Sequence, residues 1–111
     1  MKGDRLGEFE ELTLLAVCAI SASGDDVYGV PVQQFVEKQT GRDVTMGAVY
    51  SALDRLEDKG YVRSVMGEAA QKRGGKRKRL FEATPPGLKV VRELRRVRER
   101  IWFEIEAERK A

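Results

Sequence analysis

The sequence predicts a mainly α-helical (α+β) fold in which a short β-hairpin separates a helix with one polar face from a long terminal helix. Three observations support this prediction. Apolar residues recur at helical spacing between Thr45 and Gly60. Strand-forming residues flank a run of cations within residues 72–79. A segment that starts at Leu88 repeats apolar residues every three or four positions.

The first part of the chain predicts two helices. Residues 6–21 form the first, and its second half is apolar on nearly all sides, which indicates burial between the core and another surface such as a partner subunit. Residues 23–26 form a turn, and residues 30–40 form a second helix that Gly41 ends. We expect residues 42–44 to pair as a short strand with the hairpin.

A third helix is expected between Thr45, whose hydroxyl can cap free backbone N–H groups, and Gly60, which can take the left-handed stop conformation. Its core stripe consists of Val49, Ala52, Leu53 and Leu56. The opposite face is small and polar, so it can enter a DNA major groove about 12 Å wide. The candidate contacts to phosphates or base edges are Thr45, Gly47, Ala48, Tyr50, Ser51 and Arg55. The alternative is an ordinary solvated helix face.

Residues 61–66 and 79–84 are rich in strand formers and enclose a cationic loop around Gly74 and Gly75. The cations are Lys72, Arg73, Lys76, Arg77, Lys78 and Arg79. Such a run is usually only a solvated loop. Beside a polar-faced helix it is instead typical of a winged helix-turn-helix domain, in which the hairpin, or wing, lies along the phosphate backbone. The two elements together predict double-stranded DNA as the partner, with strongly salt-sensitive binding.

The composition argues against an enzyme, a metal site and a cofactor. The chain has no histidine and one cysteine, so it lacks the commonest general base and cannot build a zinc cluster. Cys18 lies in an apolar segment, which predicts a buried, inert thiol. No apolar run reaches the roughly 18 residues of a membrane span. The lone cysteine and the absence of a secretion signal predict a cytoplasmic protein.

A terminal helix is expected to run for about 20 residues from Leu88, after a pair of prolines. Its apolar residues step by four, three, four and four, close to a coiled-coil seam. The seam predicts a homodimer that uses Leu15, Val90, Leu94, Val97, Ile101 and Ile105. The alternative is a helix that folds back on its own core. The chain would then comprise a winged-helix DNA-binding domain, residues 1–84, and a dimerisation helix, residues 85–111, in one compact unit.

From Leu12 to Ile101 the chain resembles the PadR-like winged-helix transcriptional regulators, and a set of motifs carries the resemblance. The motifs are Tyr28-Gly29, the run over residues 47–57, Gly60-Tyr61-Val62, Arg79-Leu80-Phe81 and Thr84-Pro85-Pro86-Gly87. The resemblance implies a homodimer whose C-terminal helix crosses its partner and which represses promoters over palindromic operators. It also implies a nucleoid-associated protein in the cytoplasm of a bacterium or archaeon. The single short terminal helix is similar to the compact branch of the family.

Within these motifs, Tyr50 matches the family tyrosine and is the best single candidate for a phosphate contact. The alternative is that it packs against the first turn of the second helix. Ala48 and Ser51 depart from the threonine and proline that the family commonly has at these places. The departure puts any contact from that threonine hydroxyl in doubt, and the operator sequence with it.

Some compact members of the family bind flat aromatic or multidrug ligands between their terminal helices. By resemblance this implies an effector pocket at Trp102, with Phe9, Leu15 and Phe103. The alternative is that Trp102 packs in the dimer seam. For the chain as a whole, the alternative function is a winged-helix protein-interaction module with only non-specific affinity for DNA.

Overall fold

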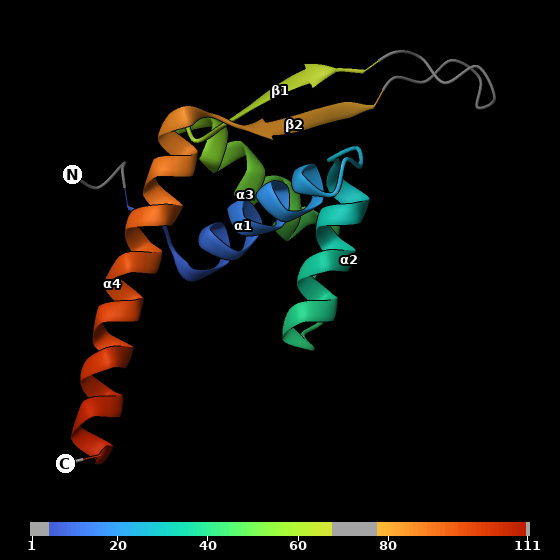
Figure 1. Cartoon of the computed structure of the whole chain (residues 1–111). Coiled ribbons are helices and arrows are strands. Elements are labelled where there is room, and N and C mark those ends of the chain that lie inside the picture. The colour runs from blue at the N-terminus through green and yellow to red at the C-terminus, as the bar shows by residue number, and fades with distance from the viewer. Residues whose placement is uncertain (1–4, 68–77, 111) are drawn as a thin grey trace.

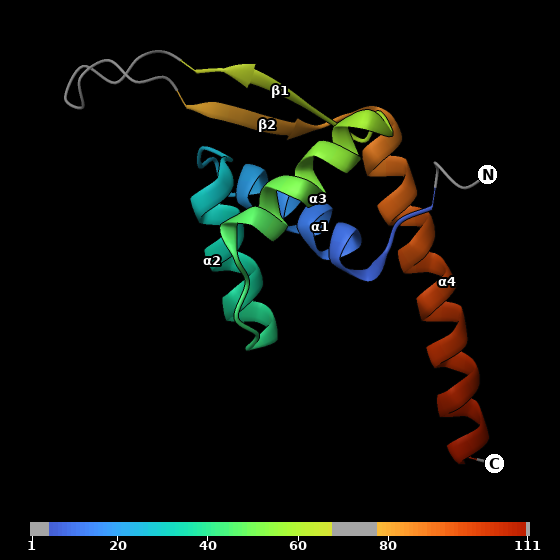
Figure 2. The same cartoon turned by 180° about the vertical axis from the view of Figure 1, so that it is seen from behind.

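The computed structural model describes residues 5–67 and 78–110 of the chain. Its elements are α1 (Glu8–Ala22), α2 (Gly29–Thr40), α3 (Met46–Asp58), β1 (Val62–Met66), β2 (Arg79–Ala83) and α4 (Pro85–Lys110). Helices α1, α2 and α3 pack together, the hairpin extends from one end of this group, and α4 leaves it as a long arm (Figure 1; Figure 2 from behind). This arrangement confirms the predicted mainly helical winged-helix fold.

The core lies where the three short helices meet the inner face of the hairpin. The expected stripe of α3, namely Val49, Ala52, Leu53 and Leu56, is fully buried. It packs against α1 and α2 with Leu14, Val17, Val32 and Val36. Phe81 of β2 and Val91 of α4 join the same cluster, so the wing and the terminal arm are both attached to the helical core.

The hairpin is a two-stranded antiparallel sheet in which Ser64 pairs with Phe81 and Arg63 with Glu82. Because side chains alternate along a strand, Ser64 and Phe81 share the face toward the helices. Arg63 and Glu82 lie on the other face and form an ion pair across the strands. The register thus gives the hairpin one face against the core and one in solvent.

The predicted strand at residues 42–44 is wrong. The Val44 N–H donates to Glu37 Oε2 at 2.9 Å, and the Val44 carbonyl accepts from Gln33 Nε2 at 2.7 Å. Side chains of α2 therefore satisfy the backbone groups that a strand would have used. The hairpin instead meets the segment before α2, where the Phe81 N–H donates to the Val27 carbonyl at 2.9 Å.

Helix α4 starts three residues earlier than expected and is longer, with 26 residues. Thr84 explains the start, because its carbonyl accepts the Leu88 N–H at 2.9 Å and its hydroxyl accepts the Gly87 N–H at 3.2 Å. Pro85 and Pro86 then fill the first turn, where no backbone N–H is needed. The ends of the other helices and strands lie within two residues of those predicted.

Within residues 5–67 and 78–110, we find no helix that combines the length and the apolarity needed to cross a membrane.

Candidate nucleic-acid interface

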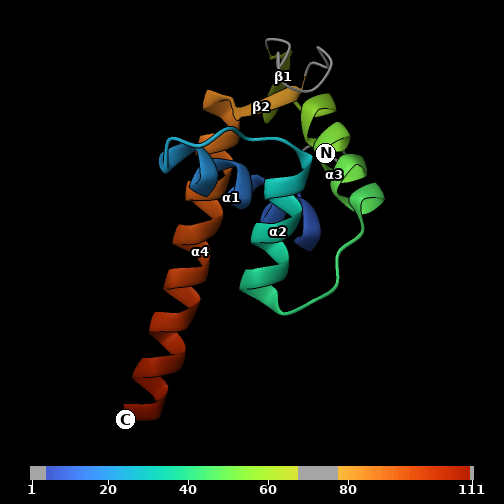
Figure 3. The same cartoon turned by 90° about the vertical axis from the view of Figure 1, so that its right-hand side faces the viewer.

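The N-terminal half of α3 presents a small, polar surface to solvent. Thr45 caps the helix, since its hydroxyl oxygen accepts the Ala48 N–H at 3.0 Å. The side chains predicted to contact DNA are exposed along this half, apart from the half-buried Ala48. In Figure 3, α3 lies at the outer side of the helical group and runs up to the hairpin. The start of this helix therefore has room to approach a groove.

Tyr50 is exposed on this surface and also packs against the first turn of α2. Its side chain is 38% exposed. A Cβ atom placed on Gly29 would lie 2.6 Å from the ring carbon that carries the Tyr50 hydroxyl. Any larger residue at position 29 would push the Tyr50 side chain away, which accounts for glycine in the Tyr28-Gly29 motif. Both roles considered for Tyr50 are thus compatible, because the ring is held in place while part of it stays accessible.

Arg55 is held by Glu10 of α1, a residue that sequence reasoning missed. Arg55 Nε lies 2.7 Å from Glu10 Oε2, and Lys59 Nζ lies 2.5 Å from Glu10 Oε1. Burial raises the pKa of Glu10, but the hydrogen bonds from Lys59 and Arg55 outweigh it and hold that pKa below its ordinary value. The sequence did contain a signal for this role of Glu10. It is a carboxylate that stands at helical spacing with Leu14 and the rest of the core stripe of α1.

Of the six predicted wing cations, two lie within the described residues, Lys78 and Arg79. Lys78 Nζ lies 4.3 Å from the centre of the Tyr28 ring. The Arg79 guanidinium, predicted as a DNA-facing cation, instead contacts Asp54 at 3.1 Å and Glu57 at 2.7 Å on α3. The remaining predicted wing contacts, Lys72, Arg73, Lys76 and Arg77, lie outside the described residues. The start of β2 is therefore joined to the candidate DNA-facing helix by charge pairs.

The residues predicted for dimerisation lie along α4 and the facing part of α1. Val90 and Leu94 are half-buried near the core. Farther along the arm, Val97, Ile101 and Ile105 are exposed. Leu15 of α1 is also 40% exposed, unlike the fully buried Leu14 beside it. An apolar stripe therefore remains open to solvent on the single chain.

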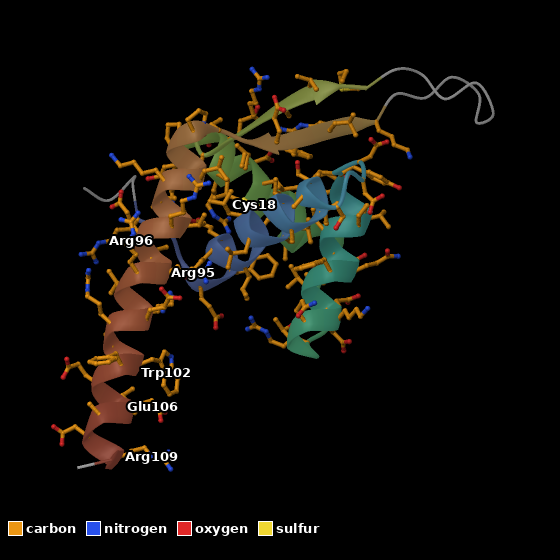
Figure 4. The ribbon with its side chains drawn as sticks, viewed as in Figure 1. Cys18, Arg95, Arg96, Trp102, Glu106 and Arg109 are labelled. Atoms are coloured by element: carbon orange, nitrogen blue, oxygen red, sulfur yellow. The ribbon has the colours of Figure 1, made fainter. Side chains whose placement is uncertain are left out.

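The four residues predicted for an effector pocket do not gather in one place. Leu15 and Trp102 line a hollow of about 510 Å³ between α1 and α4, whose rim carries Glu11 and Arg98. Phe103 lines a different hollow along α4 with Ile101. Phe9 lies beside residues 42–45 at the start of α3. In Figure 4, Trp102 and Arg95 extend from the side of α4 that faces the helical group.

The described residues hold no group of three or more side chains placed to bind a metal ion. Cys18, labelled in Figure 4, is half-buried in α1. Burial raises the pKa of its thiol, although Arg92 lowers it in part. A thiol that is protonated at neutral pH is a poor nucleophile.

Comparison with known proteins agrees with this geometry. The model of the transcriptional regulator PadR-like family matches residues 18–93, more than half of the chain. No curated protein matches. A PadR family regulator of Clostridium difficile is 20% identical, with a TM-score of 0.66, over 95% of this chain and 100% of its own. A PadR-like regulator of Bacillus cereus is 18% identical, with a TM-score of 0.68, over 89% and 88%.

A third similar structure contains nucleic acid. Bacillus subtilis PadR, solved in complex with operator DNA, is 12% identical with a TM-score of 0.61, over 78% of this chain and 46% of its own. These identities support the fold, and the family model supports the class of protein. The chain belongs to the PadR-like family of transcriptional regulators, as its motifs predicted, and it is a regulator rather than an enzyme.

Proposed function

We propose that the chain is a sequence-specific DNA-binding repressor that acts as a homodimer on a palindromic operator. The observation that carries this proposal is the exposed start of α3, where Thr45, Gly47 and Ser51 leave a small, polar surface on the helix that leads into the wing. An α-helix with small side chains on one face can lie deep in the major groove and reach base edges. Bacillus subtilis PadR, which has a similar fold, was solved in complex with operator DNA, and this supports DNA as the partner.

In this proposal, α3 reads bases and the wing contacts phosphates. Tyr50, which is 38% exposed, contributes a phosphate contact through its hydroxyl, and Arg55 reaches the backbone from the groove edge. The wing cations add sequence-independent attraction to the duplex. The protein acts in the cytoplasm of a bacterium or archaeon, where the nucleoid is accessible.

The homodimer is proposed from the apolar stripe of α4. Three large aliphatic side chains of one stripe, Val97, Ile101 and Ile105, are exposed at 42%, 55% and 39%. An exposed stripe at coiled-coil spacing is normally covered by another helix. A second copy would cover it with the same residues around a twofold axis and would present two copies of α3 to a palindromic site.

Selection from a random duplex library over a range of salt concentrations tests this function. An enriched inverted repeat with half-sites about one DNA turn apart is the expected result. Enrichment of no sequence, with an affinity that collapses as salt rises, would contradict the proposal. That outcome would favour a winged helix that contacts an acidic protein and has only non-specific affinity for DNA.

We further propose that a flat aromatic effector relieves repression by binding beside Trp102. The apolar hollow shared with Leu15 supports this proposal, because a flat ring can stack on an indole. Trp102 is the single tryptophan of the chain, so its fluorescence reports on this place alone. Titration with a panel of planar cations and phenolic acids should quench or shift the emission. Unchanged emission across the panel would remove the effector proposal.

A further inference from the structure

We propose that Arg79, Asp54 and Glu57 form a brace that fixes the angle between the wing and α3, and that this angle is part of how the protein selects its operator. The inference rests on the proposed DNA-binding function. It assigns Arg79 a positioning role in place of a direct phosphate contact.

The brace joins the two elements at the end of the hairpin that is far from their covalent link. Arg79 is the first residue of β2 and pairs with Met66, the last residue of β1. Asp54 and Glu57 are three residues apart on α3, so they lie on one face of the helix. One guanidinium contacts both, with Nη1 at 3.1 Å from Asp54 and Nη2 at 2.7 Å from Glu57. A planar fork with several N–H groups is suited to such a double contact.

Glu57 holds both strands of the wing at once. Its Oε1 accepts from Arg79 of β2. Its Oε2 accepts from Ser64 of β1, both from the hydroxyl at 2.8 Å and from the backbone N–H at 3.2 Å. These bonds lower the pKa of Glu57, with the Ser64 hydroxyl as the largest cause and Arg79 adding to it against a smaller opposing effect of burial.

The arginine is also fixed from its apolar side. The centre of its guanidinium lies 4.8 Å from the centre of the Phe81 ring. Phe81 is 4% exposed and belongs to the core, and its N–H is bonded to the Val27 carbonyl. Arg79 is therefore held by two carboxylates and one buried ring. A side chain with three partners inside the chain is poorly placed to add a fourth contact to a phosphate.

Such a brace matters because α3 and β1 are connected covalently only through residues 59–61. The hydrogen bond from the Phe81 N–H to the Val27 carbonyl holds the hairpin to the segment before α2 rather than to α3. The brace supplies hydrogen bonds and ion pairs between α3 and both strands, so it fixes the angle between the wing and this helix. Asp54 also lies on the exposed side of α3, at 57% exposure, where its charge would repel phosphates. Pairing with Arg79 offsets that repulsion. The brace thus serves both the geometry and the electrostatics of the interface.

Glu57→Gln tests the brace, because a pure charge effect and the loss of the brace predict opposite changes in affinity for the selected duplex. Loss of one negative charge should tighten binding to every duplex if charge alone matters. If the brace sets the wing angle, affinity for the library-selected duplex should fall by roughly fivefold or more, while a shuffled duplex of equal length binds as well as before or better. Fluorescence anisotropy of both labelled duplexes over a salt series measures the ratio. Asp58→Asn is the matched control, since Asp58 is exposed on α3 and makes no ion pair with a described residue.

Arg79→Lys provides the second variant, because it keeps the charge but loses the fork that reaches two carboxylates. A phosphate contact would tolerate lysine, with little change in the salt slope or in the preference between duplexes. The brace predicts a lower preference for the selected duplex with an unchanged salt slope. A lysine variant that matches the wild type in both readouts would overturn the proposal, as would equal tightening of both duplexes by Glu57→Gln.

Two measurements without DNA separate this inference from the proposed function. Urea unfolding identifies any variant that merely fails to fold. In NMR spectra of the wild type, the Nη–H groups of Arg79 should give resolved signals, because both ends of the fork are bonded, and Glu57→Gln should collapse them. Collapsed signals in the wild type would exclude the brace. If the wild type shows resolved Arg79 signals but no preference among duplexes, the brace exists as a structural contact. The proposed function would then be excluded, and with it the role of the brace in selecting an operator.

Discussion

At the scale of single residues, two glycines are explained by what packs against them. Gly29 makes room for Tyr50, and Gly87 in the first turn of α4 makes room for the backbone of Tyr61. A Cβ on Gly87 would overlap the Tyr61 carbonyl oxygen and lie 3.0 Å from its carbon. A backbone carbonyl cannot rotate away as a side chain can. Both glycines therefore set how closely elements approach, and neither has a positive φ.

Gly87→Ala should destabilise the fold by about 2 kcal/mol, because the added methyl group forces α4 away from Tyr61. Gly47→Ala is the matched control in a helical position with no neighbour closer than 4.0 Å. It should leave stability unchanged or raise it by about 0.5 kcal/mol, since alanine favours a helix. Urea unfolding of both variants measures the difference. Equal effects of the two substitutions would show that the contact with Tyr61 is unimportant.

Tyr50→Phe should separate the two roles of this tyrosine. The ring stays against Gly29, so stability should change by less than about 0.5 kcal/mol. Loss of the hydroxyl should weaken binding to selected and shuffled duplexes alike, by about fivefold, because a phosphate contact carries no sequence information. Anisotropy titrations at fixed salt test this. Wild-type affinity in the variant would leave the ring with a packing role only.

The sequence was a good guide to residues on helices and a poor one to pairs between elements. Thr45 and the stripe of α3 could be recognised because capping and periodicity are local properties. The partners of Glu10 lie more than 40 positions away in the chain, at Arg55 and Lys59. Likewise, Arg79 was predicted to be one more wing cation, because no feature of the neighbouring sequence shows that two carboxylates of α3 face it. Ion pairs of this kind depend on tertiary packing, which the local pattern does not encode.

At the scale of elements, Glu10 connects the start of α1 to the end of α3. Its side chain is 9% exposed and bonds Arg55 and Lys59. The Gly7 N–H also donates to it at 3.3 Å. A buried carboxylate with these donors is stable only while it is ionised. The packing of α1 against α3 should therefore respond to acid.

Glu10→Gln should lower the free energy of unfolding by about 1–3 kcal/mol at pH 7. The folded pKa of Glu10 is lower than its ordinary value of 4.5. Its stabilising contribution is therefore fully present above pH 4.5 and is lost as pH falls through the folded pKa. The gap between wild type and variant should narrow as pH falls below 4.5. Urea midpoints from pH 7 to pH 3 measure it, and a gap that stays constant would exclude the ionised carboxylate as its cause.

Glu108→Gln serves as the control for the loss of a carboxylate. Glu108 is exposed on α4 and makes no ion pair with a described residue. The free energy of unfolding of this variant should therefore equal that of the wild type at every pH, within about 0.5 kcal/mol.

The ends of an element were predictable where a capping residue marks them. The prediction failed where contacts with another element satisfy the backbone groups instead. Gly60, with φ of +80°, follows α3 as expected. The strand expected at residues 42–44 failed because Gln33 and Glu37 of α2 capture the backbone of Val44. The early start of α4 followed from Thr84, whose capping role was visible in the sequence only by analogy with Thr45.

At the scale of the whole molecule, the terminal arm dominates the shape. The chain measures 63 Å along its longest axis against 31 and 25 Å across. Arg98 fastens the arm to Glu11 of α1 at 2.5 Å. Beyond that ion pair the apolar stripe continues on a helix that no other described element covers. The exposed side chains of this stripe, Val97, Ile101 and Ile105, are therefore available for assembly.

Ile101→Glu should convert the proposed homodimer into a monomer, because it places a charge at the centre of the stripe. Arg96→Gln is the matched control, since it changes the net charge by the same amount and Arg96 stands about 140° around the helix from Ile101. Light scattering after size exclusion should give the mass of one chain for Ile101→Glu and of two chains for the control. A dimeric Ile101→Glu would place the interface elsewhere.

The joint between wing and arm has a mechanical consequence. Thr84 donates its N–H to the Tyr61 carbonyl at 3.0 Å, and Gly87 packs on that same peptide group. The arm beyond it is 26 residues long, or about 39 Å, so a turn of about 5° at the joint displaces the far end by about 3 Å. That displacement is close to the rise of one base pair. In the proposed dimer, the stiffness of this joint, together with the contacts of Val91 with the core and of Arg98 with Glu11, would thus set how much variation in half-site spacing the protein tolerates.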